Sequence, residues 1–423
     1  MERVAILGGC RTPFAPYHAE LARVSAIDLA AVAVRGLLKR VTVHADEIDE
    51  LIWGTVHPPL GVPNFAREIT LRALSAKVVG VTMSHAGLSS IRAITAACDA
   101  LDSYPEKIFM AGGSESLSNM PIAFPDRLTQ RLYTKHFARS KFRKFVNALK
   151  WHPGDYFPQI PEFVEPSTGM TLDQYGERVA RLFTISREEQ DRWAMRSRQK
   201  AAAGGGARLE TEPVETGDKK NPTLTADSGV GSDESIERLG ALPPLVDPAG
   251  TLTSGNSAKP ADGACALLLT SERNARRLGY EPKAFIKSYS YAALPPDDEM
   301  LLGPALSIPS LLLQTGVAFR DIDVVEMHEA SAAQALANMR ALGSKDFLTR
   351  HNQILAGQID IDEARVNAAG GTLACGHPFG ATGARLMLQC TRRLIDNGGG
   401  LGLVTAGGAG GQGVAVLLEG ITR

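Results

Sequence analysis

The chain has few cysteines, no excess of charge of either sign and no long apolar run. Only five of its 423 residues are cysteine, and no two of them form a CxxC pair. Scattered cysteines argue against a metal centre or a disulfide framework, and they suit a reducing compartment. No apolar segment approaches the ~20 residues that a membrane-spanning helix needs. We therefore predict no metal site, no structural disulfide and no transmembrane helix.

The balanced charge narrows the range of partners. The formal net charge is -1, from 45 basic and 46 acidic residues. No global basic field favours nucleic acid, so none is expected as a partner. Hydrophobic residues make up 44% of the chain, enough to bury a core in two or three domains. Because Met1-Glu2-Arg3 leads directly into an apolar segment, no secretory signal is expected and a cytoplasmic location is predicted.

Short apolar strands alternate with helical patterns along the chain. Such alternation predicts sheets covered by helices on both faces. The rhythm occurs early and returns late, which indicates an internal duplication. The predicted strands cover residues 4–7, 52–56, 108–111, 324–327, 401–406 and 413–418, and the predicted helices cover 26–38, 89–101, 331–342 and 384–395.

An insertion from residue 122 to 245 separates the two parts. Its first portion, residues 127–151, is basic with interleaved apolar side chains. Two interpretations stay open: a solvated loop with one helix packed on the body, or a helix that contacts a membrane surface or a partner. Residues 204–237 are rich in Gly, Asp, Glu and Thr, and are predicted to form a loop.

Six sequence blocks, in order, resemble thiolases, enzymes that make or break carbon–carbon bonds in acyl-CoA thioesters. Residues 327–330 and 300–305 further resemble the β-subunit of the fatty-acid-oxidation trifunctional enzyme and its bacterial counterpart. The six blocks are Arg11-Thr12-Pro13-Phe14, residues 63–69, residues 112–119, residues 253–257 with 262–264, His328-Glu329-Ala330 and residues 376–385.

The resemblance implies an α/β fold of two similar βαβαβαββ halves, in five layers (αβαβα) with an inserted loop domain. The implied boundaries are residues 1–121 with 246–272 for the first half, 122–245 for the insertion and 273–423 for the second half. It also implies a homodimer or a higher homo-oligomer that pairs through the first half, near residues 112–119.

Two glycines stand where thiolases carry cysteine. In that family one cysteine, on a turn before a buried helix, is the nucleophile, and a second cysteine in a glycine-rich turn is the acid/base. The corresponding positions here are Gly87 and Gly407. Glycine can perform neither role, although it tolerates the strained backbone of such a turn. We therefore predict that classical thiolysis is absent.

Two histidines remain at the positions that the resemblance assigns to chemistry. His377 would activate the nucleophile and bind a thioester oxygen, and His328 would help to form the oxyanion hole. We predict that both face one cavity with the turns of Gly87 and Gly407. Cys375, two residues before His377, is either a surrogate nucleophile or a small filler under its loop.

The resemblance also places the route of the CoA arm. Ser257, Ala258, Lys259 and Tyr175 would lie along the pantetheine tunnel, where Tyr175 and Lys259 add bulk and charge. Lys259 either pairs with a CoA phosphate or substrate carboxylate, or narrows the tunnel. No cofactor is predicted besides CoA or an acyl-CoA as ligand.

Three functions are compatible with these residues. The first is an acyl-CoA enzyme with altered chemistry, such as decarboxylation or direct carbon–carbon cleavage through an enolate. The second is a non-catalytic subunit or acyl-CoA-binding scaffold, with a hydratase/dehydrogenase α-subunit or an active thiolase paralogue as partner. The third is ordinary 3-ketoacyl-CoA thiolysis through Cys375.

Overall fold

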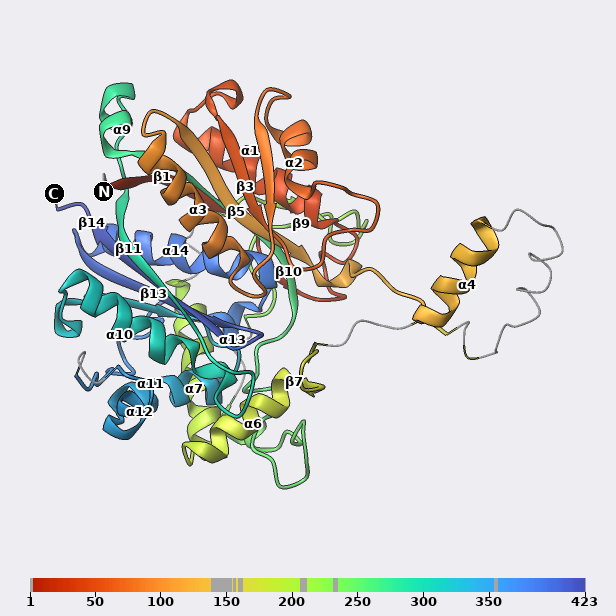
Figure 1. Ribbon diagram of the computed structural model, residues 1–423, viewed down its shortest axis with the longest axis vertical. Helices are drawn as coiled ribbons and strands as arrows, with labels where there is room; N and C mark the ends of the chain where they lie inside the picture. Colours follow the sequence, from red (N-terminus) through yellow and green to blue (C-terminus); the bar gives the residue numbers. More distant parts are fainter. Residues whose placement is uncertain are drawn as a thin grey trace.

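The computed structural model describes residues 3–137, 154, 157–158, 163–205, 211–230, 235–353 and 357–422. Its main feature is a ten-stranded sheet with the order β12-β13-β14-β11-β1-β10-β5-β3-β4, in which β2 pairs with β10 (Figure 1). The strands are β1 Val4–Arg11, β2 Ala15–Pro16, β3 Glu50–Gly54, β4 Val79–Met83, β5 Ile108–Ser116, β6 Val164–Glu165, β7 Met170–Thr171, β8 Val214–Glu215, β9 Thr223–Leu224, β10 Ala261–Ser271, β11 Ala284–Ala293, β12 Val324–Met327, β13 Gly400–Gly408 and β14 Gln412–Gly420.

The helices alternate with these strands, as the sequence pattern predicts. They are α1 Ala26–Val41, α2 Phe65–Ala73, α3 Ser89–Ser103, α4 Asp126–Phe137, α6 Leu172–Leu182, α7 Arg187–Lys200, α8 Ile236–Gly240, α9 Glu272–Leu278, α10 Gly303–Thr315, α11 Ala332–Gly343, α12 Lys345–Arg350, α13 Thr372–Cys375 and α14 Phe379–Asp396.

The sheet consists of two halves, and the strands follow the same order in both. The first half runs β4-β3-β5-β10-β1, with β3 parallel to both β4 and β5. The second runs β12-β13-β14-β11, and Val366 forms a parallel bridge beside β12 where β4 stands in the first half. This repetition confirms the predicted α/β fold of two similar halves. The two half-sheets are nevertheless continuous, because residues 4–6 of β1 pair with residues 284–286 of β11.

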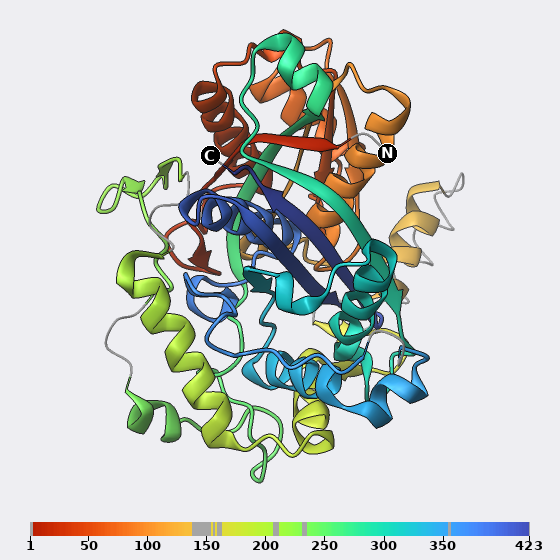
Figure 2. The ribbon, with the colours of Figure 1, turned by 90° about the vertical axis from the view of Figure 1, so that its left-hand side faces the viewer.

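Helices form three layers around the two half-sheets. α3 and α14 pack on each other between the half-sheets, and α1 and α2 cover the outer face of the first. α10 covers the outer face of the second, and α11 packs on α10 (Figures 1 and 2). Three buried apolar clusters fill the spaces between these layers. α14 is buried along most of its circumference, as expected for a helix enclosed by two sheets.

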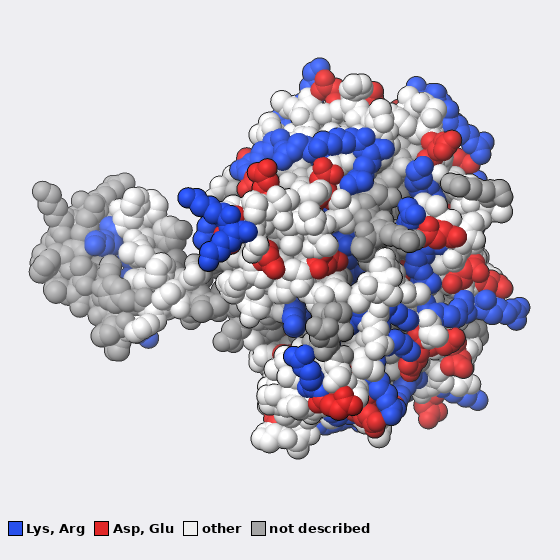
Figure 3. Space-filling model, turned by 180° about the vertical axis from the view of Figure 1, so that it is seen from behind, with Lys and Arg blue, Asp and Glu red and all other residues white. Residues whose placement is uncertain are grey.

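The segment between the halves supplies α6 and α7, which pack on α11. α4 instead projects from the body (Figure 1), and its Tyr133 and Phe137 are 63% and 73% exposed. Most of the basic stretch 127–151 lies outside the described residues. Among the described helices, none is long and apolar enough to cross a membrane. On the face shown in Figure 3, basic and acidic side chains are interspersed.

The contact between the two central helices depends on one glycine. A Cβ at Gly383 of α14 would lie only 2.4 Å from Cγ1 of Ile91 in α3. We predict that Gly383→Ala destabilises the protein by about 1–3 kcal/mol, because overpacking outweighs the gain in helix propensity. The measurement is thermal unfolding followed by circular dichroism.

Gly240→Ala in α8 is the matched control, because nothing lies within 4 Å of a Cβ at that exposed position. This substitution should leave the unfolding temperature unchanged or raise it. Equal unfolding temperatures for Gly383→Ala and the wild type would show that α3 and α14 can separate without cost.

Candidate functional site

Gly87 lies in the tight turn between β4 and α3. The Ser89 hydroxyl closes this turn, since it accepts the N–H of His85 at 2.8 Å and donates to the carbonyl of Ala86 at 2.7 Å. The left-handed backbone conformation falls on Ala86, with φ +45°, and Gly87 itself has no positive φ. The strained backbone expected of this turn therefore falls on Ala86, and a side chain is sterically allowed at position 87.

Three of the predicted positions meet at Gly87. A Cβ at this residue would lie 3.7 Å from both Cε1 and Nε2 of His377, and 3.8 Å from the carbonyl oxygen of Gly407. These are ordinary van der Waals distances. A Cβ at Gly407 would instead press on Cδ of Pro304 at 3.3 Å. Position 87 therefore has room for a small side chain directed at the His377 imidazole.

His377 lies between α13 and the first turn of α14. Its Nδ1 is hydrogen-bonded to Oγ1 of Thr382 at 2.7 Å, and its backbone N–H donates to the carbonyl of Lys259 at 2.9 Å. These contacts fix the ring with Nε2 toward Gly87. Burial, with the nearby His328 and Arg385, holds the pKa of His377 well below its ordinary value. The imidazole is therefore neutral at pH 7.

His328 follows β12, and its ring centroid lies 4.3 Å from that of His377. Its Nδ1 is 3.2 Å from Oγ1 of Thr372, which also accepts a hydrogen bond from Nη2 of Arg385 at 3.2 Å. Because the guanidinium can only donate, the Thr372 hydroxyl hydrogen is free to point at Nδ1. We assign the neutral Nε2–H tautomer to His328. Burial, aided by Arg385, lowers the pKa of His328 to about 3.

Gly87, His328, His377 and Gly407 together form what we call the paired-histidine site. Four separate segments supply these residues, and the structure brings all four segments together. The chemical roles of the residues stay predictions.

Glu329 anchors the loops around this site. Its Oε1 accepts the indole N–H of Trp193 at 2.9 Å, and its Oε2 accepts the Ser197 hydroxyl at 3.0 Å and the backbone N–H of Leu373 at 3.2 Å. The carboxylate therefore ties α7 to α13, the short helix that precedes His377. These contacts orient the neighbouring segments on both sides of Glu329.

Glu115 in β5 is a positioning residue that the sequence did not single out. Its buried carboxyl accepts the backbone N–H groups of Val56, His57 and Gly380 at 2.9 to 3.0 Å. It thus holds the first turn of α14, directly after His377, on the first half-sheet. Burial raises the pKa of Glu115 to about 7. Only its place in the block of residues 112–119 pointed to it.

Residues 257–259 reach the site through their backbones. The Ala258 N–H donates to the Ala330 carbonyl at 3.0 Å, and the Lys259 carbonyl binds His377, while the Lys259 side chain is exposed. The Ser257 hydroxyl is buried with no hydrogen-bond partner in the described part of the chain. Ser257 therefore presents a free polar atom, whereas Lys259 adds no bulk to the interior.

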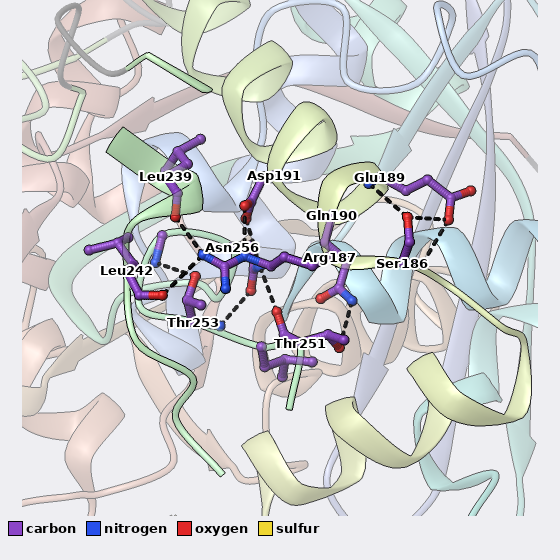
Figure 4. Close-up of polar contacts among 12 residues, drawn as sticks. Ser186, Arg187, Glu189, Gln190, Asp191, Leu239, Leu242, Thr251, Thr253 and Asn256 are labelled. Carbon is purple, nitrogen blue, oxygen red and sulfur yellow. Dashed lines mark hydrogen bonds and ion pairs between the residues drawn. The ribbon is translucent and has the colours of Figure 1, made fainter. Parts of the chain in front are cut away.

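A polar network holds the preceding loop against α7 (Figure 4). Asn256 Nδ2 donates to Oδ1 of Asp191 at 2.9 Å, and Nε of Arg187 donates to Oδ2 of the same carboxylate at 2.7 Å. Gln190 Nε2 donates to Oγ1 of Thr251 at 2.9 Å. These contacts fix the position at which residues 257–259 pass His377.

Tyr175 and Cys375 have surroundings that differ from each other and from those of the Gly87 turn. Tyr175 is fully buried in an apolar cluster, and its hydroxyl bonds to Oγ1 of Thr168 and the Pro296 carbonyl. The Cys375 thiol contacts the carbonyls of Gly371 and Gly376 and lines a separate cavity. Burial raises the pKa of this thiol, which disfavours the thiolate. The geometry favours Cys375 as a filler.

Two duplicated α/β halves whose central helices pack together, with a pair of buried histidines near the start of one of these helices, define the thiolase class of protein. The sequence matches the thiolase N-terminal domain over residues 4–273 and the thiolase C-terminal domain over residues 280–420. The chain therefore belongs to the thiolase family, as the sequence blocks predicted.

Individual relatives show which thiolases the chain is similar to. The chain is 37% identical to a 3-ketoacyl-CoA thiolase of Shewanella frigidimarina, covering 99% of this chain and 97% of the relative. It is 36% identical to one of Pectobacterium atrosepticum, with the same coverage. Among solved structures, Bacillus anthracis acetyl-CoA acetyltransferase superposes with TM-score 0.84 at 28% identity, covering 100% and 99% of the two chains. Human mitochondrial 3-ketoacyl-CoA thiolase in complex with CoA superposes with TM-score 0.84 at 26% identity, covering 100% and 98%.

The low pKa of His328 predicts a measurable pH dependence. Below pH 6.5, His328 binds a proton in the unfolded state but stays neutral in the folded state. The stability that His328 contributes is therefore lost as the pH falls. We expect the stability difference between the wild type and His328→Gln to shift by about 2 kcal/mol against the wild type between pH 7.5 and 4.5. Urea unfolding at both pH values measures it.

The comparison cancels groups that both proteins share. Glu115 and Glu326, whose pKa values burial raises to about 7, act in the opposite direction and are present in each protein. A stability difference that stays constant over this pH range would contradict a neutral, buried His328.

Proposed function

We propose that this thiolase-family protein binds a CoA thioester and transforms it without forming an acyl-enzyme. The observation that carries the proposal is the side-chain-free Gly87 opposite Nε2 of His377. A covalent acyl intermediate needs a nucleophile at that point, and glycine provides none. The CoA ligand is supported by the names of the relatives, which are 3-ketoacyl-CoA thiolases and a thiolase solved with CoA.

The groups that remain are suited to an enolate. In a CoA thioester with a carboxylate on the α-carbon, loss of CO₂ leaves the bonding electron pair as an enolate, and water then protonates that carbon. The Nε2–H of His328 can donate to the thioester oxygen on which the negative charge develops. A neutral donor held by Thr372 costs no reorganisation during this step.

A non-catalytic role is the second candidate, and α4 is the feature that favours it. Tyr133 and Phe137 present stacked, exposed rings on a projecting helix that carries Arg131 and Lys135. Exposed aromatic side chains of this kind are typical of partner or membrane contacts. A scaffold that binds acyl-CoA in a larger complex would use both α4 and the paired-histidine site. Thiolysis through Cys375, in contrast, would require the thiol to leave its contacts with Gly371 and Gly376.

The central test compares adduct formation with turnover. We expect wild-type protein to release acetyl-CoA from malonyl-CoA, to show no thiolysis of acetoacetyl-CoA, and to carry no acyl group by mass spectrometry. Gly87→Cys should gain an acetyl adduct on incubation with acetoacetyl-CoA, because its thiol would face Nε2 of His377. Gly407→Cys is the matched control, since its side chain would face Pro304.

The opposite result is equally specific. Wild-type thiolysis that is lost in Cys375→Ala would identify the protein as a 3-ketoacyl-CoA thiolase with a displaced nucleophile. Tight binding of acetyl-CoA without release of CO₂ from malonyl-CoA would instead favour the scaffold.

We also propose that the protein is a homodimer, paired through the first half. β4 ends the described strand order of that half, and Val79 and Val81 on it are 56% and 36% exposed. Residues 112–116, by contrast, are buried in β5. An exposed apolar edge strand is a template for pairing with a second chain.

We predict that light scattering gives twice the chain mass at micromolar concentration. Val81→Lys should lower this value toward one chain, because it places a charge on the open edge. Leu313→Lys, at an exposed apolar position on α10, should not. A wild-type monomer, or a dimer indifferent to Val81→Lys, would contradict the proposed interface.

A further inference from the structure

A cavity is lined in part by residues of the segment that precedes His377. It measures about 310 Å³, within the range of small-molecule sites, and it opens partly to solvent. Cys375 lines it, and α14 contributes Arg385 and Gln389. Ala369 and Gly370, on the segment before α13, form another wall. Neither Gly87, His328 nor His377 lines it, so it is distinct from the paired-histidine site.

The charged side chains that line this cavity, Arg11, Asp227 and Arg385, do not cancel one another. Arg11 is matched by Asp227, which accepts two hydrogen bonds from its guanidinium at 2.6 and 2.9 Å. Arg385 is 1% exposed, and its hydrogen-bond partners among the described residues are neutral: Oε1 of Gln389 at 2.8 Å and Oγ1 of Thr372 at 3.2 Å. Within the described part of the chain, its Nε has no hydrogen-bond partner. The buried carboxyl of Glu326 interacts electrostatically with Arg385, but it is already paired with Arg393 at 3.0 Å, so two guanidinium groups share one carboxyl.

A buried guanidinium that shares its counter-charge with a second guanidinium is incompletely compensated, and an anion beside it would stabilise it. The geometry points to a binding site for one small oxyanion, a short-chain carboxylate or inorganic phosphate, held by Arg385 in this cavity. We propose this site as an addition to the paired-histidine site. It does not rest on the proposed function, because binding can be measured without any CoA ester.

The position of Arg385 makes such an anion consequential. The same guanidinium donates to Thr372, and Thr372 is hydrogen-bonded to Nδ1 of His328. An anion on Arg385 would draw the guanidinium toward the cavity and offset its charge. The contact between Thr372 and the His328 imidazole would change with it, so the cavity is an effector site coupled to the paired-histidine site through one side chain.

The apolar part of the wall suits a short aliphatic chain. Ala201, Val230 and Ala369 also line the cavity. A carboxylate of two to four carbons would place its oxygens at Arg385 and its chain against these residues. Phosphate would contact only the charged residues. Comparing the affinities of the two anions therefore shows whether the site prefers a short-chain carboxylate or phosphate.

The experiment is calorimetric titration of the full chain with butyrate and, separately, with inorganic phosphate at constant ionic strength. We expect at least one of these two anions to bind saturably, with one anion per chain. Ala369→Leu should weaken that binding about tenfold or more by filling the cavity. Ala368→Leu, at the exposed neighbouring position that does not line the cavity, should bind as the wild type does.

Two further measurements separate the proposal from general effects. Arg385→Lys, checked for folding by circular dichroism, should bind the anion more weakly because it loses the planar fork. In the wild type, the His328 imidazole nitrogens should change chemical shift on saturation, and in Ala369→Leu they should not. Absence of saturable binding by either anion, or equal binding to the wild type and Ala369→Leu, would overturn the site.

Discussion

The packing of α3 against α14 between the two half-sheets is the contact on which the site depends. A residue of the site directly precedes each helix: Gly87 lies just before α3, and His377 lies just before α14. Because Gly383 allows the helices to approach closely, their N-termini meet. Two helix N-termini create a positive potential at this point. That potential favours the negative charge that develops on a thioester oxygen, and it disfavours a protonated histidine.

Much of the scaffold could be predicted from local pattern. The strand at 324–327 is confirmed at both ends, and the helix predicted from residue 26 begins there, with the Ser25 hydroxyl as its N-terminal cap. α14, however, begins at Phe379 instead of the predicted residue 384. Its first turn is held by Glu115, from a strand some 260 residues away in sequence. No local signal could show that contact.

The sequence was enough to predict which residues form the site, but not the backbone conformation and contacts of those residues. Sequence blocks identified His328, His377, Gly87 and Gly407, which the structure brings together. Sequence could not show that Ala86 carries the left-handed conformation, or that Lys259 points to solvent while its carbonyl holds His377. It also gave no sign that Arg385 reaches Thr372. These features depend on tertiary contacts and not on residue type.

The continuity of the two half-sheets has a consequence for how the chain is made. β1, at the very start of the sequence, needs β10 and β11 as its neighbours, and these strands end at residues 271 and 293. A ribosome must therefore synthesise more than two thirds of the protein before its first strand can be paired on both sides. Until then, the apolar residues of β1 stay without their final contacts, and the nascent chain is exposed to aggregation. Cotranslational folding of the first half alone would leave its innermost edge open.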